Sequence, residues 1–121
     1  MNVRDGWAQA SIRVWRDSGL ASAIPDSLVG LGEYNSERTV FVLPVAADSP
    51  EPDLPELLSA AERLIDRHLG LLRILTSSSC NVDLFIGWSP RAPQQSVTFS
   101  SRLISLLGQI TAEITIDTYG E

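Results

Sequence analysis

The sequence predicts an α+β domain in which a four-stranded, at least partly antiparallel sheet carries two main helices and one short helix on one face. Apolar residues recur at every third or fourth position between Ser101 and Ile110, which is helical spacing. From Thr111 to Tyr119 they alternate strictly with polar residues, as in a half-buried strand. A helix that runs directly into a strand predicts a sheet with a helical layer. The 121 residues, 44% of them hydrophobic, suit a single domain over residues 1–121.

The N-terminal part of the chain contains two predicted strands and a short helix. Residues 7–16 alternate a row of small apolar side chains with a row of polar and Trp side chains, which predicts the first strand. Residues 22–31 can form a short helix, because Pro25 is suited to a first turn. Residues 37–46 are β-branched and aromatic enough for a second strand, and Pro44 favours an edge or a strand end.

A long helix is predicted to begin at Asp53 and to end near Leu75. Asp53 can cap its first turn, Pro55 is tolerated there, and Glu56 lies favourably against the helix dipole. The helix carries one continuous apolar stripe, formed by Leu57, Leu58, Ala61, Leu64, Ile65, Leu69 and Leu72. This stripe predicts the main helical contact with the sheet.

The C-terminal part contains a third strand, the closing helix and a fourth strand. Residues 81–88 alternate between two faces and predict the third strand. Ser100 or Ser101 can cap the closing helix, which Gly108 ends. The alternation that begins at Thr111 predicts the final strand.

Three of these segments together resemble a known family. The strand Asn81–Trp88, the helix Phe99–Leu107 and the terminal strand Glu113–Tyr119 resemble the bacterial family catalogued as domain of unknown function 4279. In that family a Leu-Ser-x-x-Leu-Leu-x-x-Leu helix leads into a strand that ends Asp-x-Tyr, and the strand Ala10–Val14 is similar to its first strand. The resemblance implies a small bacterial α+β domain without an established activity, whose relatives are thought of as binding or immunity-type proteins. It implies no catalytic residues.

The composition argues against several function classes. Nine basic and fifteen acidic residues give a formal net charge of −6, whereas a nucleic-acid surface normally requires a basic excess. No apolar run is long enough to span a bilayer, so we expect no membrane partner. The N-terminal residues lack the apolar segment of a signal peptide, and the cytoplasm is therefore the expected location.

The chain offers few residues for metal or covalent chemistry. Cys80 is its single cysteine, and a buried structural thiol is favoured over a redox or nucleophilic one. His68 is the single histidine and lies at the edge of the apolar stripe, where a partly buried core histidine is favoured over a catalytic one. We therefore predict no metal, no cofactor and no catalytic residue.

The most distinctive predicted surface is the side of the sheet opposite the helices. Alternation places aromatic, arginine and carboxylate side chains there together, and such groups concentrate contact energy in protein interfaces. The predicted binding residues are Arg13, Trp15, Asp83, Phe85, Glu113, Asp117 and Tyr119. The leading hypothesis is a binding protein that uses this face on another protein or on itself, with a homodimer as the commonest arrangement. The alternative is an ordinary solvated face.

A competing hypothesis is a small enzyme or ligand-binding protein. Its pocket would lie near Trp88 and the loop Ser89–Ser96, and it would use the carboxylates of Asp83, Glu113 and Asp117. Carboxylates on neighbouring strands can perturb each other and carry out acid-base chemistry. Convergence of the three in a closed cavity would favour this hypothesis, and the lack of an accompanying nucleophile favours a protein without catalytic activity.

Overall fold

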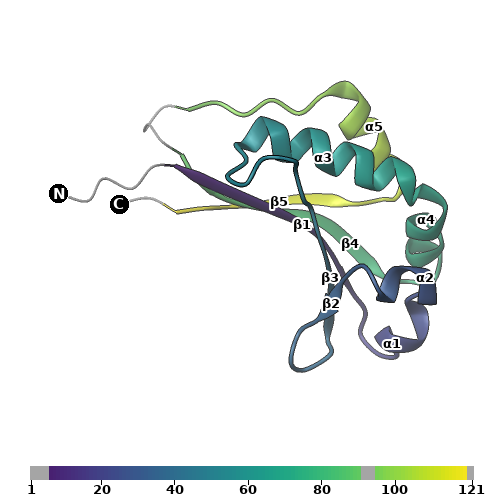
Figure 1. Ribbon diagram of the computed structural model, residues 1–121. Coiled ribbons are helices and arrows are strands. Elements are labelled where there is room, and N and C mark those ends of the chain that lie inside the picture. Colours follow the sequence, from purple (N-terminus) through teal and green to yellow (C-terminus); the bar gives the residue numbers. More distant parts are fainter. Residues whose placement is uncertain (1–5, 91–94, 120–121) are drawn as a thin grey trace.

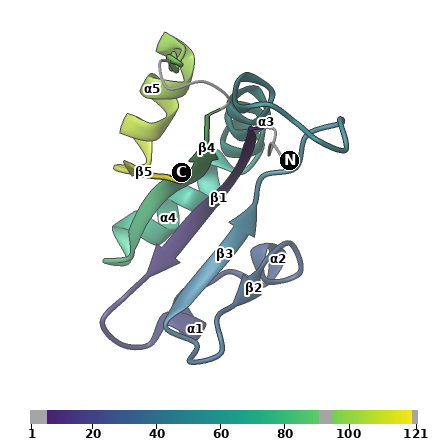
Figure 2. The same ribbon diagram turned by 90° about the vertical axis from the view of Figure 1, so that its left-hand side faces the viewer.

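The computed structural model describes residues 6–90 and 95–119 and contains one mixed sheet. The elements follow the chain in this order: β1 Trp7–Trp15, α1 Leu20–Ala23, α2 Asp26–Val29, β2 Glu33–Tyr34, β3 Val40–Pro44, α3 Leu54–Arg67, α4 Leu69–Ser77, β4 Asn81–Ser89, α5 Ser101–Gln109 and β5 Glu113–Thr118. The strand order is β2-β3-β1-β4-β5, with β2 and β5 at the two edges (Figure 2). Only the pair β4 and β5 is parallel; the other neighbours are antiparallel.

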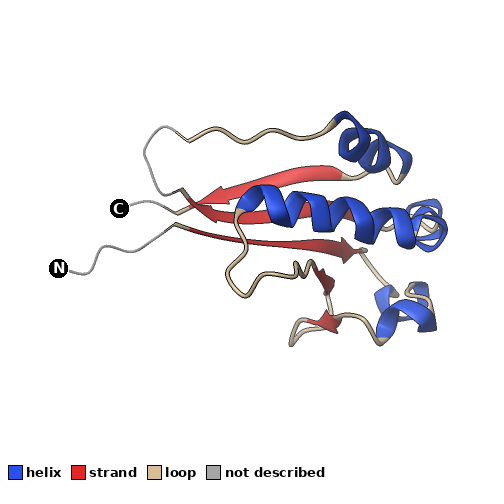
Figure 3. Cartoon of the chain, turned by 45° about the horizontal axis from the view of Figure 1, so that its top comes forward, coloured by secondary structure: helices blue, strands red, loops and turns tan. Residues whose placement is uncertain are grey.

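The helices cover one face of the sheet. In Figure 1, α3 and α5 lie above β1, β4 and β5, and α1, α2 and α4 lie beyond the right-hand ends of these strands. Figure 3 shows α3 running along the strands, with α5 on one side of it. The predicted α+β class is therefore confirmed. None of the helices within residues 6–90 and 95–119 is long and apolar enough to cross a membrane.

The sheet has five strands among the described residues, where the sequence predicted four. The additional strand is β2, which pairs Glu33 with Val42 and Tyr34 with Phe41. Two residues are too few to produce a recognisable alternation, since the pattern needs about four positions or more. The other four strands lie within about three residues of their predicted positions.

The helices also differ from prediction in three places. Gly108, which was predicted to end the closing helix, lies inside α5, which continues to Gln109. The predicted long helix is divided at His68, whose φ is −113°, into α3 and α4. In Figure 1, α4 turns away from α3 at the end of the sheet, and this turn keeps Leu72 and Leu75 buried. The predicted helix at residues 22–31 is two single turns, because Pro25 lacks an N–H and Ile24 before it is extended.

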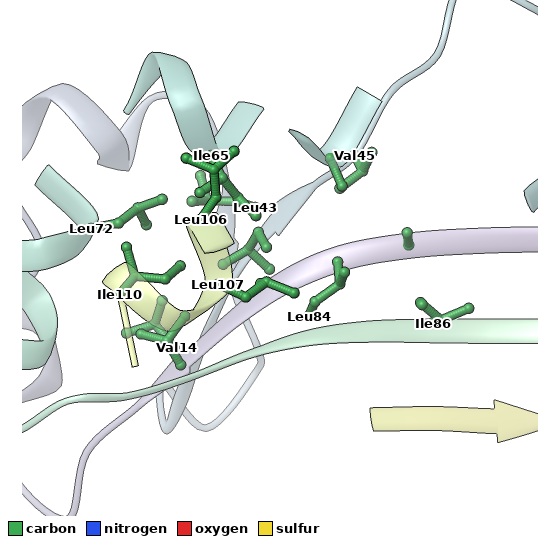
Figure 4. Close-up of a cluster of buried hydrophobic side chains, with 14 of the residues drawn as sticks. Val14, Leu43, Val45, Ile65, Leu72, Leu84, Ile86, Leu106, Leu107 and Ile110 are labelled. Carbon is green, nitrogen blue, oxygen red and sulfur yellow. The ribbon is translucent and has the colours of Figure 1, made fainter. Parts of the chain in front are cut away.

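One continuous hydrophobic core fills the space between sheet and helices. Figure 4 shows side chains from strands and helices meeting there, including Val14, Leu84, Ile65 and Leu107. Two caps fix where the helices begin. The Asp53 carboxylate accepts the Glu56 N–H at 2.9 Å, as predicted, and the Ser100 hydroxyl accepts the Leu103 N–H at 3.0 Å.

A glycine packed against β3 gives the first prediction. A Cβ at Gly32 would overlap the carbonyl oxygen of Val42 and lie 2.8 Å from Cζ of Phe41. We expect Gly32→Ala to lower the free energy of unfolding by about 1–3 kcal/mol, the usual cost of overpacking. Gly30→Ala is the matched control, because nothing lies within 4 Å of its Cβ position. Urea denaturation of both variants checks this, and equal losses would contradict the overlap.

Candidate functional site

The open face is the side of β1, β4 and β5 that faces away from the helices. Alternation along the strands places one residue in two on it, whereas Ile12, Leu84 and Ile114 have the opposite phase and lie on the helix side. Its side chains are Trp7, Gln9, Ser11, Arg13, Trp15, Asn81, Asp83, Phe85, Ser89, Glu113, Thr115, Asp117 and Tyr119. The seven binding residues predicted from the sequence therefore lie on one surface.

A paired arginine and aspartate form the centre of this face. Arg13 and Asp83 are direct partners in the antiparallel pair of β1 and β4. The Nε and Nη2 atoms of Arg13 donate to Oδ1 and Oδ2 of Asp83 at 3.0 and 2.6 Å, and the Thr115 hydroxyl donates to Oδ2 at 2.8 Å. Asp83 is only 1% exposed. The carboxylate is thus buried on an otherwise open surface, and its hydrogen bonds offset the loss of water.

The same arginine is held between aromatic rings. Its Cζ atom lies 4.2 Å from the ring centroid of Phe85 and 5.9 Å from that of Trp15. Both distances allow a cation–π contact. Hydrogen bonding to Asp83 raises the pKa of the Arg13 guanidinium above its already high ordinary value, so this residue stays charged at any physiological pH. The guanidinium is therefore held in one position on the open face.

A second aromatic pair lies at the far end of the open face. The rings of Trp7 and Tyr119 have centroids 5.1 Å apart and are tilted by 35°. A Cβ at Gly87 would lie 3.2 Å from the Gln9 side chain and 3.5 Å from the Trp7 ring. The glycine therefore allows both side chains to lie close across β4.

The three carboxylates of the enzyme hypothesis, those of Asp83, Glu113 and Asp117, do not meet in one cavity, and they differ in burial. Asp83 lies beside Glu113 in the parallel register, but its carboxylate forms a salt bridge with Arg13. Glu113 and Asp117 are exposed. None of the three lines either of the two described cavities, which lie elsewhere on the molecule.

The larger described cavity does include the predicted pocket residue Trp88. It is a cleft of about 690 Å³ at the start of β1 and the end of β4. Its lining residues are Gly6, Trp7, Ala8, Pro50, Glu51, Pro52, Asp53, Leu54, Trp88, Ser89 and Gln95. Residues 91–94 of the predicted pocket loop lie outside the described residues. Of the two acids in the lining, Asp53 is already engaged in the cap of α3.

The remaining candidate residues occupy structural positions. Cys80 is buried directly before β4, as expected, and burial raises the pKa of its thiol, which therefore stays protonated at neutral pH. His68 is half-buried where α3 meets α4. Within residues 6–90 and 95–119, no group of three or more His, Cys, Asp or Glu residues could hold a metal ion.

Sequence reasoning did not identify two participants in this site. Trp7 was on the predicted first strand, but its contact with Tyr119 depends on β1 and β5 both neighbouring β4. Thr115 was placed on the correct face without a role, and its hydrogen bond to Asp83 follows from the same strand order. The signal available in the sequence was their shared phase of alternation with Arg13 and Asp83.

Comparisons of the chain with protein-family models, with curated proteins and with solved structures find no match. The resemblance to the family of domain of unknown function 4279 therefore stays a prediction. A function for this chain has to be inferred from the geometry of the open face and of the cleft.

Proposed function

We propose that this chain is a protein-binding domain without catalytic activity, which holds its partner on the open face. The observation that carries the proposal is the arginine at the centre of this face. Arg13 is fixed by a buried carboxylate and lies over the Phe85 ring, yet its side chain is still 33% exposed. An arginine and aromatic rings, held rigid and partly accessible, are the residue types that dominate protein–protein hot spots.

The surroundings of this centre have the composition of an interface. Trp15 and the pair of Trp7 and Tyr119 provide large apolar area on either side of Arg13. Gln9, Glu113 and Asp117 are exposed and provide a polar rim. An apolar and arginine centre within a polar rim is the usual organisation of a protein–protein contact surface.

A second copy of this chain is one partner that the proposal includes, as the sequence-based expectation of a homodimer suggests. An isologous contact would place the two open faces against each other around a twofold axis. An immunity-type role against another protein is the hetero-partner version of the same proposal. The acidic composition and single cysteine suit a role in the reducing cytoplasm.

Truncation of two aromatic side chains of the open face, the half-buried Trp15 and the exposed Tyr119, tests this proposal. We expect Trp15→Ala and Tyr119→Ala to weaken association by about 2 kcal/mol each, or roughly 30-fold, because hot-spot truncations have that size. Light scattering across a concentration series measures self-association, and quantitative pull-down from the source cells measures a hetero-partner.

The matched control is Ile74→Ala on α4, where the side chain is 53% exposed and belongs to the helical layer, not to the open face. Partner capture should be retained by this control and lost by the aromatic variants. Association that is unchanged in Trp15→Ala and Tyr119→Ala, with only the melting temperature altered, would overturn the proposal.

A second candidate function is binding of a small polar ligand in the cleft at Trp88. The observation that favours it is the cleft volume of about 690 Å³, which is within the range of ligand sites. The indole N–H signals in an NMR spectrum distinguish the two functions. A compound that shifts the Trp88 signal and leaves that of Trp15 unchanged would support the cleft, and the reverse pattern would support the open face.

A further inference from the structure

The outer edge of β5 has backbone groups that no described strand pairs with. β5 is the last strand of the sheet and pairs only with β4 among the described residues. The Tyr119 N–H donates to the Trp88 carbonyl at 2.8 Å, which fixes the phase of the parallel ladder. Since alternate residues of an edge strand direct their N–H and C=O groups inward and outward, those of Ile114, Ile116 and Thr118 point to the free edge.

This edge lacks most of the usual protection against strand addition, because its charged side chains, Glu113 and Asp117, repel acidic strands but not basic ones. Natural edge strands are commonly very short or carry lysine or proline. The opposite edge follows that rule, because β2 has only two residues and β3 ends at Pro44. β5 has six residues and contains neither lysine nor proline. The two edges of this sheet therefore differ in what they can accept.

The side chains beside the free edge define the chemistry of an added strand. Ile114 and Ile116 lie on the helix side and are 37% and 38% exposed. Glu113 and Asp117 are exposed on the open face, and neither forms a salt bridge within the described residues. On the helix side of the sheet, an added strand would thus lie beside the two isoleucines. On the open face it would lie beside two carboxylates that are four residues apart.

We propose that β5 binds an extended segment of another protein as a sixth strand, with the pattern basic, apolar, any residue, apolar, basic. Backbone hydrogen bonds to Ile114, Ile116 and Thr118 would supply affinity, as in other cases of strand addition. The two basic side chains face Glu113 and Asp117, and the two apolar ones extend the row of exposed isoleucines. This interaction uses the backbone of the sheet edge. It shares Glu113 and Asp117 with the polar rim of the open face, but it needs no partner on that face.

Charge favours this occupant over a second copy of the chain. In an antiparallel pair of two β5 strands centred on Thr115, Glu113 would lie opposite Asp117 of the other copy, and like charges directly opposite are destabilising. A register centred on Ile116 avoids the direct pairing but still gathers four carboxylates on one face.

A labelled peptide tests the proposal. The probe contains Lys-Val-Thr-Val-Lys between serines, and the controls are Lys-Lys-Thr-Val-Val and Glu-Val-Thr-Val-Glu between the same serines. Fluorescence anisotropy at low salt should show saturable binding of the probe alone, weakened by added salt. No binding of the probe, or equal binding of the scrambled control, would overturn the proposal.

Two variants of the protein make the test specific. Glu113→Lys with Asp117→Lys should weaken binding of the probe by roughly tenfold or more and should create binding of the acidic peptide. The control with the same change in net charge is Glu33→Lys with Glu37→Lys, two exposed residues at the opposite side of the sheet, which should leave the probe bound. If the two double variants weakened binding of the probe equally, binding would depend only on the net charge of the protein, and the proposal would be overturned.

Ile116→Pro tests the backbone component. Its N–H points outward, so proline removes an edge donor and no bond to β4. Circular dichroism and the melting temperature establish that the variant folds, and Thr118→Pro provides a second version if it does not. Loss of probe binding in a folded variant supports the proposal. Retained binding of the probe would overturn the proposal. It would also be overturned if the unchanged protein were a dimer and Ile116→Pro made it a monomer, because β5 would then pair with a second copy of the chain.

Discussion

Arg13→Met is expected to lower the free energy of unfolding by about 2–4 kcal/mol, since removing one partner of a buried ion pair leaves the other charge without compensation. Methionine preserves apolar contact with Phe85, so the loss reports mainly on charge. Among the residues that the structure describes, Asp83 would retain only the Thr115 hydroxyl as a side-chain donor, and it is 1% exposed. Urea denaturation at neutral pH measures the change.

An exposed ion pair provides the control for this prediction. Arg102 on α5 contacts Glu62 and Asp66 of α3 at 3.4 and 3.1 Å, and its side chain is 59% exposed. Arg102→Met should cost less than about 1 kcal/mol, because water screens exposed pairs. Equal losses for the two substitutions would show that the environment of Asp83 does not isolate it from solvent. Combining Arg13→Met with Asp83→Leu should recover much of the lost stability, as apolar replacement of both partners does.

The elements of this fold could be predicted because they depend on local sequence. Period-two alternation identified β1, β4 and β5, and a helical stripe with an Asp53 cap identified the start of α3. These signals arise from which side of each element is buried. They required no knowledge of what lies on that side.

The arrangement within the site could not be predicted, because it depends on strand order. The sequence placed Arg13 and Asp83 on the same face, but they are 70 residues apart and meet only because β1 and β4 are neighbours in an antiparallel register. Burial of Asp83 follows from that pairing. For the same reason the bend at His68 was missed, since it serves the burial of Leu72 at the end of the sheet.

Phe41→Ala is expected to lower the free energy of unfolding by about 3–5 kcal/mol, the range for removing a fully buried phenylalanine. Phe41 is 0% exposed and lies on the helix side of β3, opposite Val14 of β1. Its ring is 5.0 Å from that of Tyr34 and lies against Gly32, so it joins the β2 segment to the core. Phe41→Leu, which leaves a smaller cavity, should retain a large part of this stability.

The Phe41→Ala variant is also expected to open first in one part of the sheet, the hairpin of β2 and β3. The Asn35 N–H donates to the Val40 carbonyl at 2.9 Å, and this bond closes the hairpin between β2 and β3. If Phe41 joins the hairpin to the core, hydrogen exchange in Phe41→Ala should accelerate at Asn35 well before it does in the central strand β4. Uniform acceleration in both places would instead show that the sheet opens as one unit, with Phe41 contributing to the whole core and not specifically to its edge.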